Sequence, residues 1–417
     1  MMRILLIAYS FPPFQDAQSL RWYYLANCLA ELGVKIDVVS ISHPNENAGH
    51  WKFHENIQVY RVFAGFVENL FLKSKNRLKV DERGNQVLRK TAKFKLMKSL
   101  YQGGRKFAGN VLPGDIRTEW FIFAARFLDK LLEKGSYSYV ITSHEPWVDS
   151  HLGLYLMRKN RSFRWVADFG DPYVAPYTPL HKLWFENILE KAIYSRADAL
   201  IFTNHNVVTF LEKKYPFLCH KKKLVLEQGF SFASCSEDSS KRNNVFTLTY
   251  TGAFYRNFRN PLNLINALCS AKFEYKFLLV GRNEAFVRDF SVLGERFEFL
   301  GVMDHFAALR LQRDSDVLIN MGNKDCTQVP GKMYEYLGAL RPILSITYTA
   351  DDPGVKLMEE VGCGVSCMND SLAILNALER LHFGWKNHVG ITTTCGDIYK
   401  YSWENKARML FDYLIEN

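Results

Sequence analysis

The chain has 417 residues, of which 48% are hydrophobic and 23% charged, a composition typical of a globular protein with a large core. This length suits two or three domains and needs no disulfide or metal staples, which excludes the small disulfide-dense scaffolds. The 53 Lys and Arg against 43 Asp and Glu give a net charge of +10, which favours nucleic acid, an acidic membrane face or a phosphorylated ligand as partner.

The first half of the chain alternates short apolar runs, typical of buried strands, with segments of helical period. Residues 3–9 form the first run; apolar side chains then recur at helical spacing up to Leu32, and Gly33 is suited to end that helix. Residues 35–41 complete a βαβ unit. Further strands are expected at residues 137–143, 163–169, 197–204 and 223–229.

Residues 231–244 are rich in Ser, Asn and charged side chains and are predicted to form a linker. A second alternation follows. Its strands are expected at residues 247–252, 275–281, 297–301, 316–322 and 342–346, with helices after Pro261, Asp304, Pro330 and Asp352. Two such alternations predict an α/β protein of two Rossmann-like, doubly wound domains that face a central cleft. We place the domains at residues 1–238, with a terminal helix at 402–417, and at residues 239–401.

The positive charge is concentrated in residues 71–110, which hold 12 Lys or Arg and two acids, and so carry the same net charge as the whole chain. Phe94, Met97 and Tyr101 stand at near-helical spacing among these lysines. One interpretation is peripheral contact with an anionic membrane; the other is a solvated insertion that keeps the protein soluble. Nucleic acid is disfavoured because no base-stacking platform or known reader module accompanies the charge.

The cellular compartment is indicated by the cysteines and the apolar runs. Eight cysteines are scattered without zinc or disulfide spacing, as in a reducing compartment. The apolar run at the N-terminus is too short to span a membrane, and no stretch reaches 18 apolar residues. We therefore expect a cytoplasmic protein, with room for peripheral binding at the inner face of the membrane.

The segment 329–343, VPGKMYEYLGALRPI, has the features of a phosphate-binding helix start. Pro330 suits the first helical position, and Gly331 leaves the backbone N–H groups open to a ligand. Lys332 adds a positive charge in the first turn, and Glu335, one turn on, can accept hydrogen bonds from sugar hydroxyls. Ligands of doubly wound sheets bind beyond the carboxyl ends of the strands. This pattern predicts a nucleoside diphosphate site with a ribose clamp, and the alternative is an ordinary helix N-terminus.

This segment resembles the signature of the retaining glycosyltransferases of the GT-B fold, in particular the large family 4. Similar stretches run along nearly the whole chain: AYSFPP after the first strand, VADFGDPY, EKAIYSRADALIFTN, and YTGAFYRNFRNP at the start of the second half. The resemblance implies the GT-B fold, with two Rossmann-like domains and a C-terminal helix that crosses back to the first domain.

The resemblance also implies roles on the donor side. Glu335 would bind the ribose of a nucleotide-sugar, whereas Lys332 and the backbone of Gly331 would face the sugar or diphosphate. Arg256 and Arg259 would neutralise the diphosphate. The backbone at Val302 and Met303 would hold the base. Fixed cations of this kind stabilise the nucleoside diphosphate as it leaves, more in the transition state than in the ground state.

The chain departs from the family pattern at several positions. Thr327 stands where the family usually carries a glutamate that touches the donor sugar, with Asp325 as the candidate substitute. Gly170 stands where many members place a histidine after the VADF-type strand, and Ala253 where an arginine is frequent. These departures leave the fold and the donor class in place and leave the sugar and the catalytic residues open.

Three strand-end residues of the first domain are candidates for acid–base or positioning work: His144, Asp168 and Asp171. Their place at the carboxyl ends of two expected strands favours a position in the cleft. The alternative is structural, since Asp171 with Pro172 also suits a turn and Asp168 can bond nearby backbone N–H groups.

The sequence therefore predicts a glycosyltransferase that moves a sugar from a nucleotide-sugar donor to a hydroxyl acceptor with retention of configuration. The resemblance implies no metal and no cofactor. We expect a glycan or lipid-linked sugar as acceptor, as in assembly of a bacterial-type surface polysaccharide, because membrane contact through 71–110 would suit an acceptor carried on a membrane lipid. Two alternatives stay open: a degenerate GT-B protein that binds nucleotide or glycan without turnover, and a sugar-nucleotide epimerase.

Overall fold

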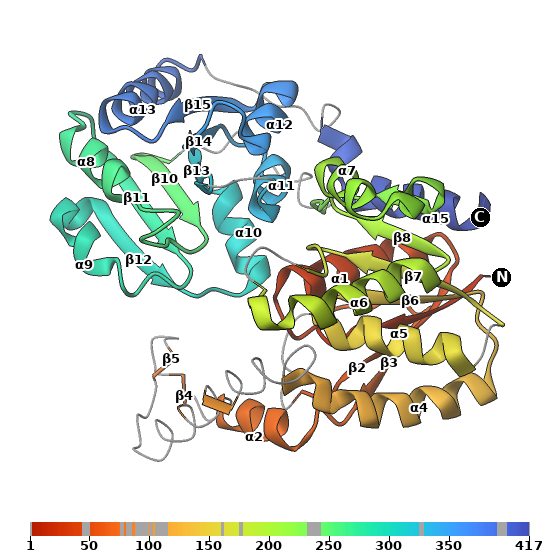
Figure 1. Ribbon diagram of the computed structural model, residues 1–417. Coiled ribbons are helices and arrows are strands. Elements are labelled where there is room, and N and C mark those ends of the chain that lie inside the picture. Colours follow the sequence, from red (N-terminus) through yellow and green to blue (C-terminus); the bar gives the residue numbers. More distant parts are fainter. Residues whose placement is uncertain are drawn as a thin grey trace. The chain divides into compact units, whose positions relative to one another are not determined.

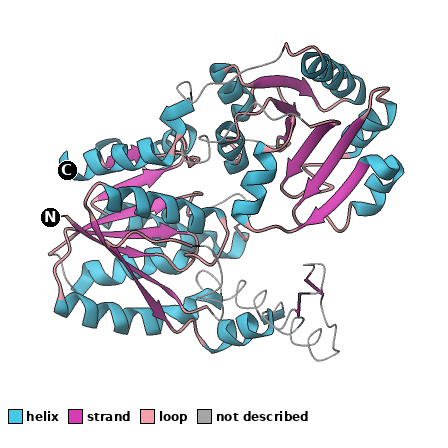
Figure 2. Ribbon diagram, turned by 180° about the vertical axis from the view of Figure 1, so that it is seen from behind, coloured by secondary structure: helices cyan, strands magenta, loops and turns pink. Residues whose placement is uncertain are grey.

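The computed structural model describes most of the chain and divides it into two compact units (Figures 1 and 2). Unit 1 comprises Met1–Glu227 and Ala407–Asn417, and unit 2 comprises Gln228–Lys406. The described residues are 2–43, 51–75, 79–80, 86–87, 99, 103–104, 116–159, 162–174, 178–231, 243–324, 329–389 and 398–416.

Unit 1 is built on a parallel sheet of seven described strands in the order β3-β2-β1-β6-β7-β8-β9. The strands are β1 (Arg3–Ile7), β2 (Lys35–Ile41), β3 (Ile57–Val62), β6 (Tyr139–His144), β7 (Arg164–Phe169), β8 (Ala199–Phe202) and β9 (Lys222–Val225). The order reverses between β1 and β6, the switch point at which doubly wound sheets bind their ligands.

Helices connect the strands of unit 1. They are α1 (Ala17–Glu31), α2 (Phe66–Lys75), α4 (Trp120–Lys134), α5 (Trp147–Lys159), α6 (Leu180–Arg196) and α7 (His205–Lys214), with 3-10 turns η1 (Ile116–Glu119) and η2 (Pro216–His220). α4, α5 and α6 lie side by side on one face of the sheet (Figure 1). A short antiparallel pair, β4 (Lys79–Val80) and β5 (Gln86–Val87), is also present.

Unit 2 repeats the design with a parallel sheet of six described strands in the order β12-β11-β10-β13-β14-β15. The strands are β10 (Phe246–Thr251), β11 (Tyr275–Val280), β12 (Phe297–Gly301), β13 (Val317–Met321), β14 (Ile343–Thr347) and β15 (Gly364–Met368). The helices are α8 (Leu262–Ser270), α9 (Val287–Phe290), α10 (His305–Arg313), α11 (Gly331–Gly338), α12 (Pro353–Val361) and α13 (Ser371–Lys386), with η4 (Ser291–Arg296) and η5 (Tyr399–Tyr401).

The last helix, α15 (Trp403–Glu416), begins in unit 2 and continues into unit 1 from Ala407 onward. Ala407, Leu410 and Leu414 are buried, as its apolar period predicts. The hydroxyl of Tyr139 on β6 donates a hydrogen bond to the carbonyl of Leu414. The C-terminal helix thus returns to unit 1.

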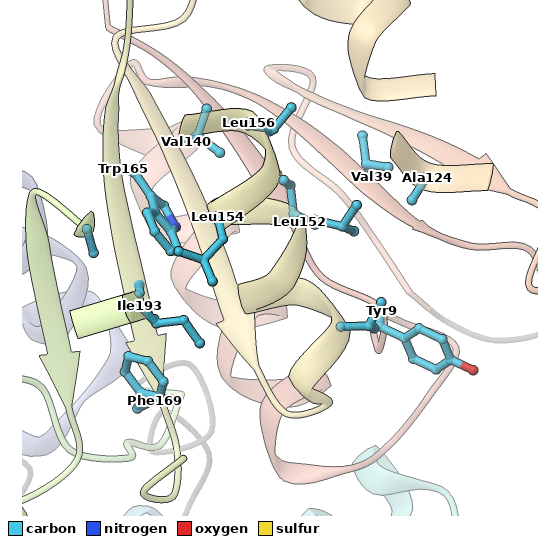
Figure 3. Packing of buried hydrophobic residues seen from close by; sticks show 14 of the residues in the cluster. Tyr9, Val39, Ala124, Val140, Leu152, Leu154, Leu156, Trp165, Phe169 and Ile193 are labelled. Carbon is cyan, nitrogen blue, oxygen red and sulfur yellow. The ribbon is translucent and has the colours of Figure 1, made fainter. Parts of the chain in front are cut away.

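The core of unit 1 is packed between the sheet and helices such as α5. Figure 3 shows Leu154 of α5 beside the ring of Trp165 on β7; both side chains are buried. Gly153 permits this approach, because a Cβ there would lie 2.3 Å from the Trp165 ring. The indole N–H donates to Oγ1 of Thr142 at 3.0 Å, so burial of the ring leaves no unsatisfied N–H group.

The predicted fold class is confirmed, since both αβ alternations form parallel sheets flanked by helices. The strand at 297–301 has the predicted limits, and Gly33 ends α1 with φ +86°. Four of the described strands were not predicted: β3, β15 and the short pair β4 and β5. One detail was wrong: Pro330 is the N-cap of α11, and Gly331 is its first helical residue. Most of the predicted basic segment 71–110 lies outside the described residues.

Candidate functional site

The start of α11 lies at the carboxyl end of the six-stranded sheet, after the segment that follows β13. Its N-cap, Pro330, makes no side-chain capping hydrogen bond, so the N–H groups of the first turn have no acceptor from that source. Among the described residues, a Cβ on Gly331 would meet only Cγ of Gln228, at 3.8 Å. Packing against these residues therefore does not require glycine here, and Gly331 is exposed.

Lys332 and Glu335 form an ion pair on this helix. Nζ of Lys332 lies 2.6 Å from Oε2 of Glu335; the lysine side chain is 39% exposed and the glutamate 14%. Burial by itself raises the pKa of Glu335, but the charges of Lys332 and His305 and the hydrogen bonds from Lys332 and Gln312 outweigh it, so the pKa is lowered. Glu335 therefore keeps its negative charge, and its Oε1 can accept a hydrogen bond from a hydroxyl.

A buried polar network supports Glu335 from beneath. Gln312 on α10 is fully buried, and its amide donates to Oγ1 of Thr251 at 2.9 Å and to Oε2 of Glu335 at 3.3 Å. The hydroxyl of Tyr336 accepts from the backbone N–H of Thr251 at 2.9 Å. Thr251 ends β10, so this network ties the carboxyl end of a central strand to α11.

The two predicted arginines occupy different surroundings. The guanidinium of Arg259 donates to Oδ1 of Asn323, from Nε at 3.1 Å and Nη2 at 2.5 Å, and to the carbonyl of Ala253 at 3.3 Å. It is thus fixed beside the segment that follows β13. Arg256 is 62% exposed and pairs with Asp289 at 3.1 Å, at the end of the sheet occupied by α9.

The predicted base-binding backbone lies between β12 and α10. Gly301 ends β12 with φ +67°, Val302 is 65% exposed, and Met303 is half-buried. Asp304 then caps α10 by accepting from the N–H groups of its first turn. Val302 and Met303 thus follow the carboxyl end of β12, the same edge of the sheet at which α11 begins.

In unit 1, His144 is the last residue of β6 and is buried among aromatic rings, with Phe169 at 5.1 Å and Tyr173 at 5.3 Å between centroids. Nδ1 lies 3.3 Å from Oγ of Ser150. Burial, then the charges of His151 and Arg117, lower the pKa of His144 to about 3. The imidazole is neutral at neutral pH, and its Nε2 has no hydrogen-bond partner among the described residues.

Asp168 lies one residue before the end of β7, opposite Ser143 in the parallel register, and is fully buried. Arg21 on α1 donates to both of its oxygens at 3.0 Å, and the Trp22 indole donates to Oδ2 at 2.9 Å. Arg21 also donates to the carbonyls of Leu226 and Glu227, the last residues of the first segment of unit 1. The carboxylate is thus engaged in a structural network.

Asp171, the third candidate, follows β7 in a partly exposed turn. The preceding Gly170 is close to the amide of Gln18, since a Cβ on the glycine would lie 3.0 Å from it. The carbonyl of Gly170 accepts from Oγ1 of Thr203 at 2.9 Å. The absence of a side chain at Gly170 thus makes room for Gln18.

Two buried polar residues of this region escaped the sequence analysis. Gln18 donates to the carbonyl of His144 and, at 3.3 Å, to Oγ of Ser143. Asp149 on α5 accepts from the N–H of Tyr9 at 2.9 Å, and its burial raises its pKa. Oε1 of Gln18 and Oδ1 of Asp149 have no partner within the described part of the chain. The sequence could have predicted the burial of Gln18, because it lies four residues before Trp22 and therefore on the apolar face of α1.

Unit 1 therefore brings His144 and Asp168 to the ends of neighbouring strands, and unit 2 brings Lys332 and Glu335 into contact. Within the described residues, no group of three or more His, Cys, Asp or Glu side chains is placed to hold a metal ion. The same residues contain no helix with the length and apolarity needed to cross a membrane.

The fold was compared with known proteins. No protein-family model and no curated protein matches the sequence. Solved structures do match over the full chain. Sucrose-phosphate synthase from Thermosynechococcus elongatus has a TM-score of 0.66 at 16% identity and covers 100% of this chain and 99% of its own. A glycosyltransferase from Rickettsia africae has a TM-score of 0.61 at 13% identity, covering 100% and 98%.

Anabaena HepE in complex with UDP and glucose has a TM-score of 0.65 at 11% identity and covers 100% of both chains. At these identities the likeness shows the fold. The chain thus has the two-domain GT-B fold shared with these glycosyltransferases, and the expected fold is confirmed.

Proposed function

We propose that this protein is a glycosyltransferase that moves a sugar from a nucleotide-sugar donor to a hydroxyl acceptor. The observation that carries this proposal is the start of α11, where an open helix N-terminus, the Lys332 ammonium and a charged Glu335 stand together at the carboxyl edge of the sheet. Neighbours in fold support it: HepE has been seen with UDP-glucose, and WaaB is a lipopolysaccharide galactosyltransferase.

Unit 2 would hold the donor. Glu335 would accept hydrogen bonds from the ribose hydroxyls, and the backbone at Val302 and Met303 would contact the base. The helix start at Gly331, with Lys332 and Arg259, would face the diphosphate. These groups are fixed before the reaction by the Gln312 network and by Asn323. They would stabilise the charge that develops on the leaving nucleoside diphosphate without reorganisation.

Unit 1 would supply the acceptor side. A neutral imidazole at His144 can accept a hydrogen bond at Nε2 and so orient a hydroxyl. Asp171, partly exposed, would contact the acceptor or donor sugar. Asp168 would act through Arg21 as a positioning residue, since its oxygens are already bonded. We expect retention of configuration without a metal or cofactor, as the family resemblance implies.

The acceptor proposed is a glycan or a lipid-linked sugar, in assembly of a surface polysaccharide. The basic segment 71–110 would then provide peripheral membrane contact at the cytoplasmic face. A second candidate function is nucleotide or glycan binding without turnover. One observation favours it: both oxygens of Asp168 are already bonded to Arg21 in a buried ion pair. The departure at Gly170 from the pattern that the family resemblance implies agrees with it.

Thermal stabilisation by UDP, GDP and ADP tests the donor site. A nucleotide at 100 times its Kd adds about 2.7 kcal/mol of stability, a rise of a few degrees in Tm. Glu335→Ala should reduce this shift, whereas Glu359→Ala, an exposed glutamate on α12, should leave it unchanged. The absence of a response to all three nucleotides contradicts the proposed site.

Product analysis with sugars of the responding nucleotide then separates the functions. A sugar transferred to an acceptor supports the transferase. An intact donor supports the binding protein, and an isomerised donor supports an epimerase.

A further inference from the structure

Helix α6 of unit 1 buries three ionisable side chains and exposes several large apolar ones. Three ionisable residues at a spacing of four are buried, at 9%, 2% and 0% exposure: Lys182, Glu186 and Glu190. Another set at the same spacing is exposed at 85%, 75% and 48%: Leu180, Trp184 and Ile188. We call this second set the α6 apolar stripe. An ordinary surface helix shows the opposite arrangement.

The inward charges have internal partners. Glu190 accepts from the N–H of Val174 at 3.0 Å, from Nζ of Lys214 at 2.5 Å and from the Tyr215 hydroxyl at 2.8 Å. Tyr173 is hydrogen-bonded to Glu186 and lies 2.8 Å from Nε2 of His151. The buried face of α6 thus secures the segment after β7 and the end of α7. That requirement explains the inward charges but not the apolar residues outside.

The exposed face combines apolar and basic side chains. Phe185 adds to the stripe at 38% exposure. Both glutamates of α6 are buried, so the ionisable residues exposed on this helix are His181, Lys191 and Arg196. α5 packs beside α6 (Figure 1), and η2 also contacts α6. A contiguous apolar surface on one helix marks an interaction site more than scattered apolar residues do.

We propose that the α6 apolar stripe docks reversibly onto a bilayer that contains anionic lipid. A helix with Trp and aliphatic residues on one side and Lys or Arg beside them lies in the interfacial plane of a membrane. Trp184 suits the headgroup level, and the stems of Lys191 and Arg196 can extend to lipid phosphates. A second copy of the chain is a poorer occupant, since two basic faces would repel each other.

This inference does not rest on the proposed glycosyl transfer, nor on segment 71–110. It adds a second, independent element of unit 1 to the membrane contact proposed above. Its charge pattern also predicts the conditions of binding: anionic vesicles should bind the protein, zwitterionic vesicles much less, and added salt should weaken the interaction.

Sedimentation of the full chain with vesicles tests the proposal, using phosphatidylglycerol mixed with phosphatidylcholine and phosphatidylcholine alone. We expect Leu180→Ser, Trp184→Ser and Ile188→Ser together to reduce partitioning into anionic vesicles by about tenfold or more. The matched control carries three serines at equally exposed apolar sites of unit 2: Val292, Leu372 and Phe383, exposed at 64%, 65% and 67%. The control should bind as the wild type does.

A second readout locates the contact. Brominated lipids should quench the fluorescence of the wild type, and Trp184→Phe should remove most of that quenching while circular dichroism and Tm stay unchanged. Three outcomes overturn the proposal. In the first, the wild-type protein does not bind anionic vesicles. In the second, the stripe variant binds them as well as the control does. In the third, light scattering detects dimers that depend on the α6 apolar stripe, and no vesicle binding is seen.

Discussion

The polar groups at the carboxyl edges of the two sheets differ in their exposure and in the segments that supply them. In unit 2 the central pair, Lys332 and Glu335, lies three residues apart on one helix and remains partly exposed. In unit 1 the polar groups come from α1, β6 and β7 and are almost wholly buried, as Gln18, His144 and Asp168 illustrate. The polar pair of unit 2 comes from one helix, whereas the polar groups of unit 1 come together only when segments distant in the sequence pack against each other.

The difference extends to charge. Glu335 has a lowered pKa because Lys332, His305 and Gln312 outweigh its burial. His144 has no such compensation, so burial favours its neutral form, and the same holds for Asp149, whose pKa is raised. One edge thus keeps charged side chains, and the other holds ionisable groups whose neutral forms are favoured.

The largest effect should come from breaking the buried ion pair of unit 1. Arg21→Met leaves the Asp168 carboxylate buried without its partner, which costs about 3–5 kcal/mol in the free energy of unfolding. Arg256→Met is the matched control in unit 2, since its pair with Asp289 is exposed and contributes about 0–1 kcal/mol. Urea denaturation measures both.

The double variant Arg21→Met with Asp168→Leu should recover part of the lost stability, because it leaves no unpaired buried charge. Equal losses for Arg21→Met and Arg256→Met, or no recovery in the double variant, would contradict the contrast between a buried and an exposed edge.

This ion pair also marks the limit of what the sequence reveals. A continuous apolar run predicted β1, because a strand that is buried on both faces consists almost entirely of apolar residues. The start of α11 was predicted within one residue, because its signals lie side by side in the chain. The sequence also placed Asp168 correctly at a strand end, but its partner Arg21 is 147 residues away, and spacing carries no information on such a contact.

Other omissions have similar causes. β3 (IQVYRV) has only six residues, and Gln58 and Arg61 interrupt its apolar residues, so it contains no continuous apolar run. The sequence did not reveal that α6 buries ionisable residues and exposes apolar ones. Both sets recur every four residues, and only packing decides which set faces inward. Sequence thus predicts elements and local motifs, and tertiary structure decides the state of the side chains.

An effect of intermediate size should appear in the pH dependence of stability. The pKa of His144 is about 3 in the folded protein, against an ordinary value near 6.5. Between these values the unfolded chain binds a proton that the folded chain does not, so stability falls as pH decreases, by roughly 2 kcal/mol between pH 6.5 and 5. His144→Gln should remove this contribution.

Chemical denaturation at several pH values measures that slope. His220→Gln, an exposed histidine of the same unit, is the control and should keep the wild-type slope. His151, whose pKa burial lowers to about 4, should sustain a residual slope in His144→Gln. If the His144→Gln slope equals that of the wild type, the histidine is not held neutral in the folded state.

The smallest effect separates the two arginines within unit 2. Arg259 is fixed by Asn323 and the Ala253 carbonyl beside the segment after β13, whereas Arg256 already pairs with Asp289 and is largely exposed. Arg259→Ala should therefore weaken nucleoside diphosphate binding by about 1.5 kcal/mol, roughly tenfold, and Arg256→Ala by less. Calorimetry with the nucleoside diphosphate and with its nucleoside gives the test, because a diphosphate contact affects only the former. Equal losses for both ligands would place the diphosphate elsewhere on this edge, and a larger loss at Arg256 would move it toward α9.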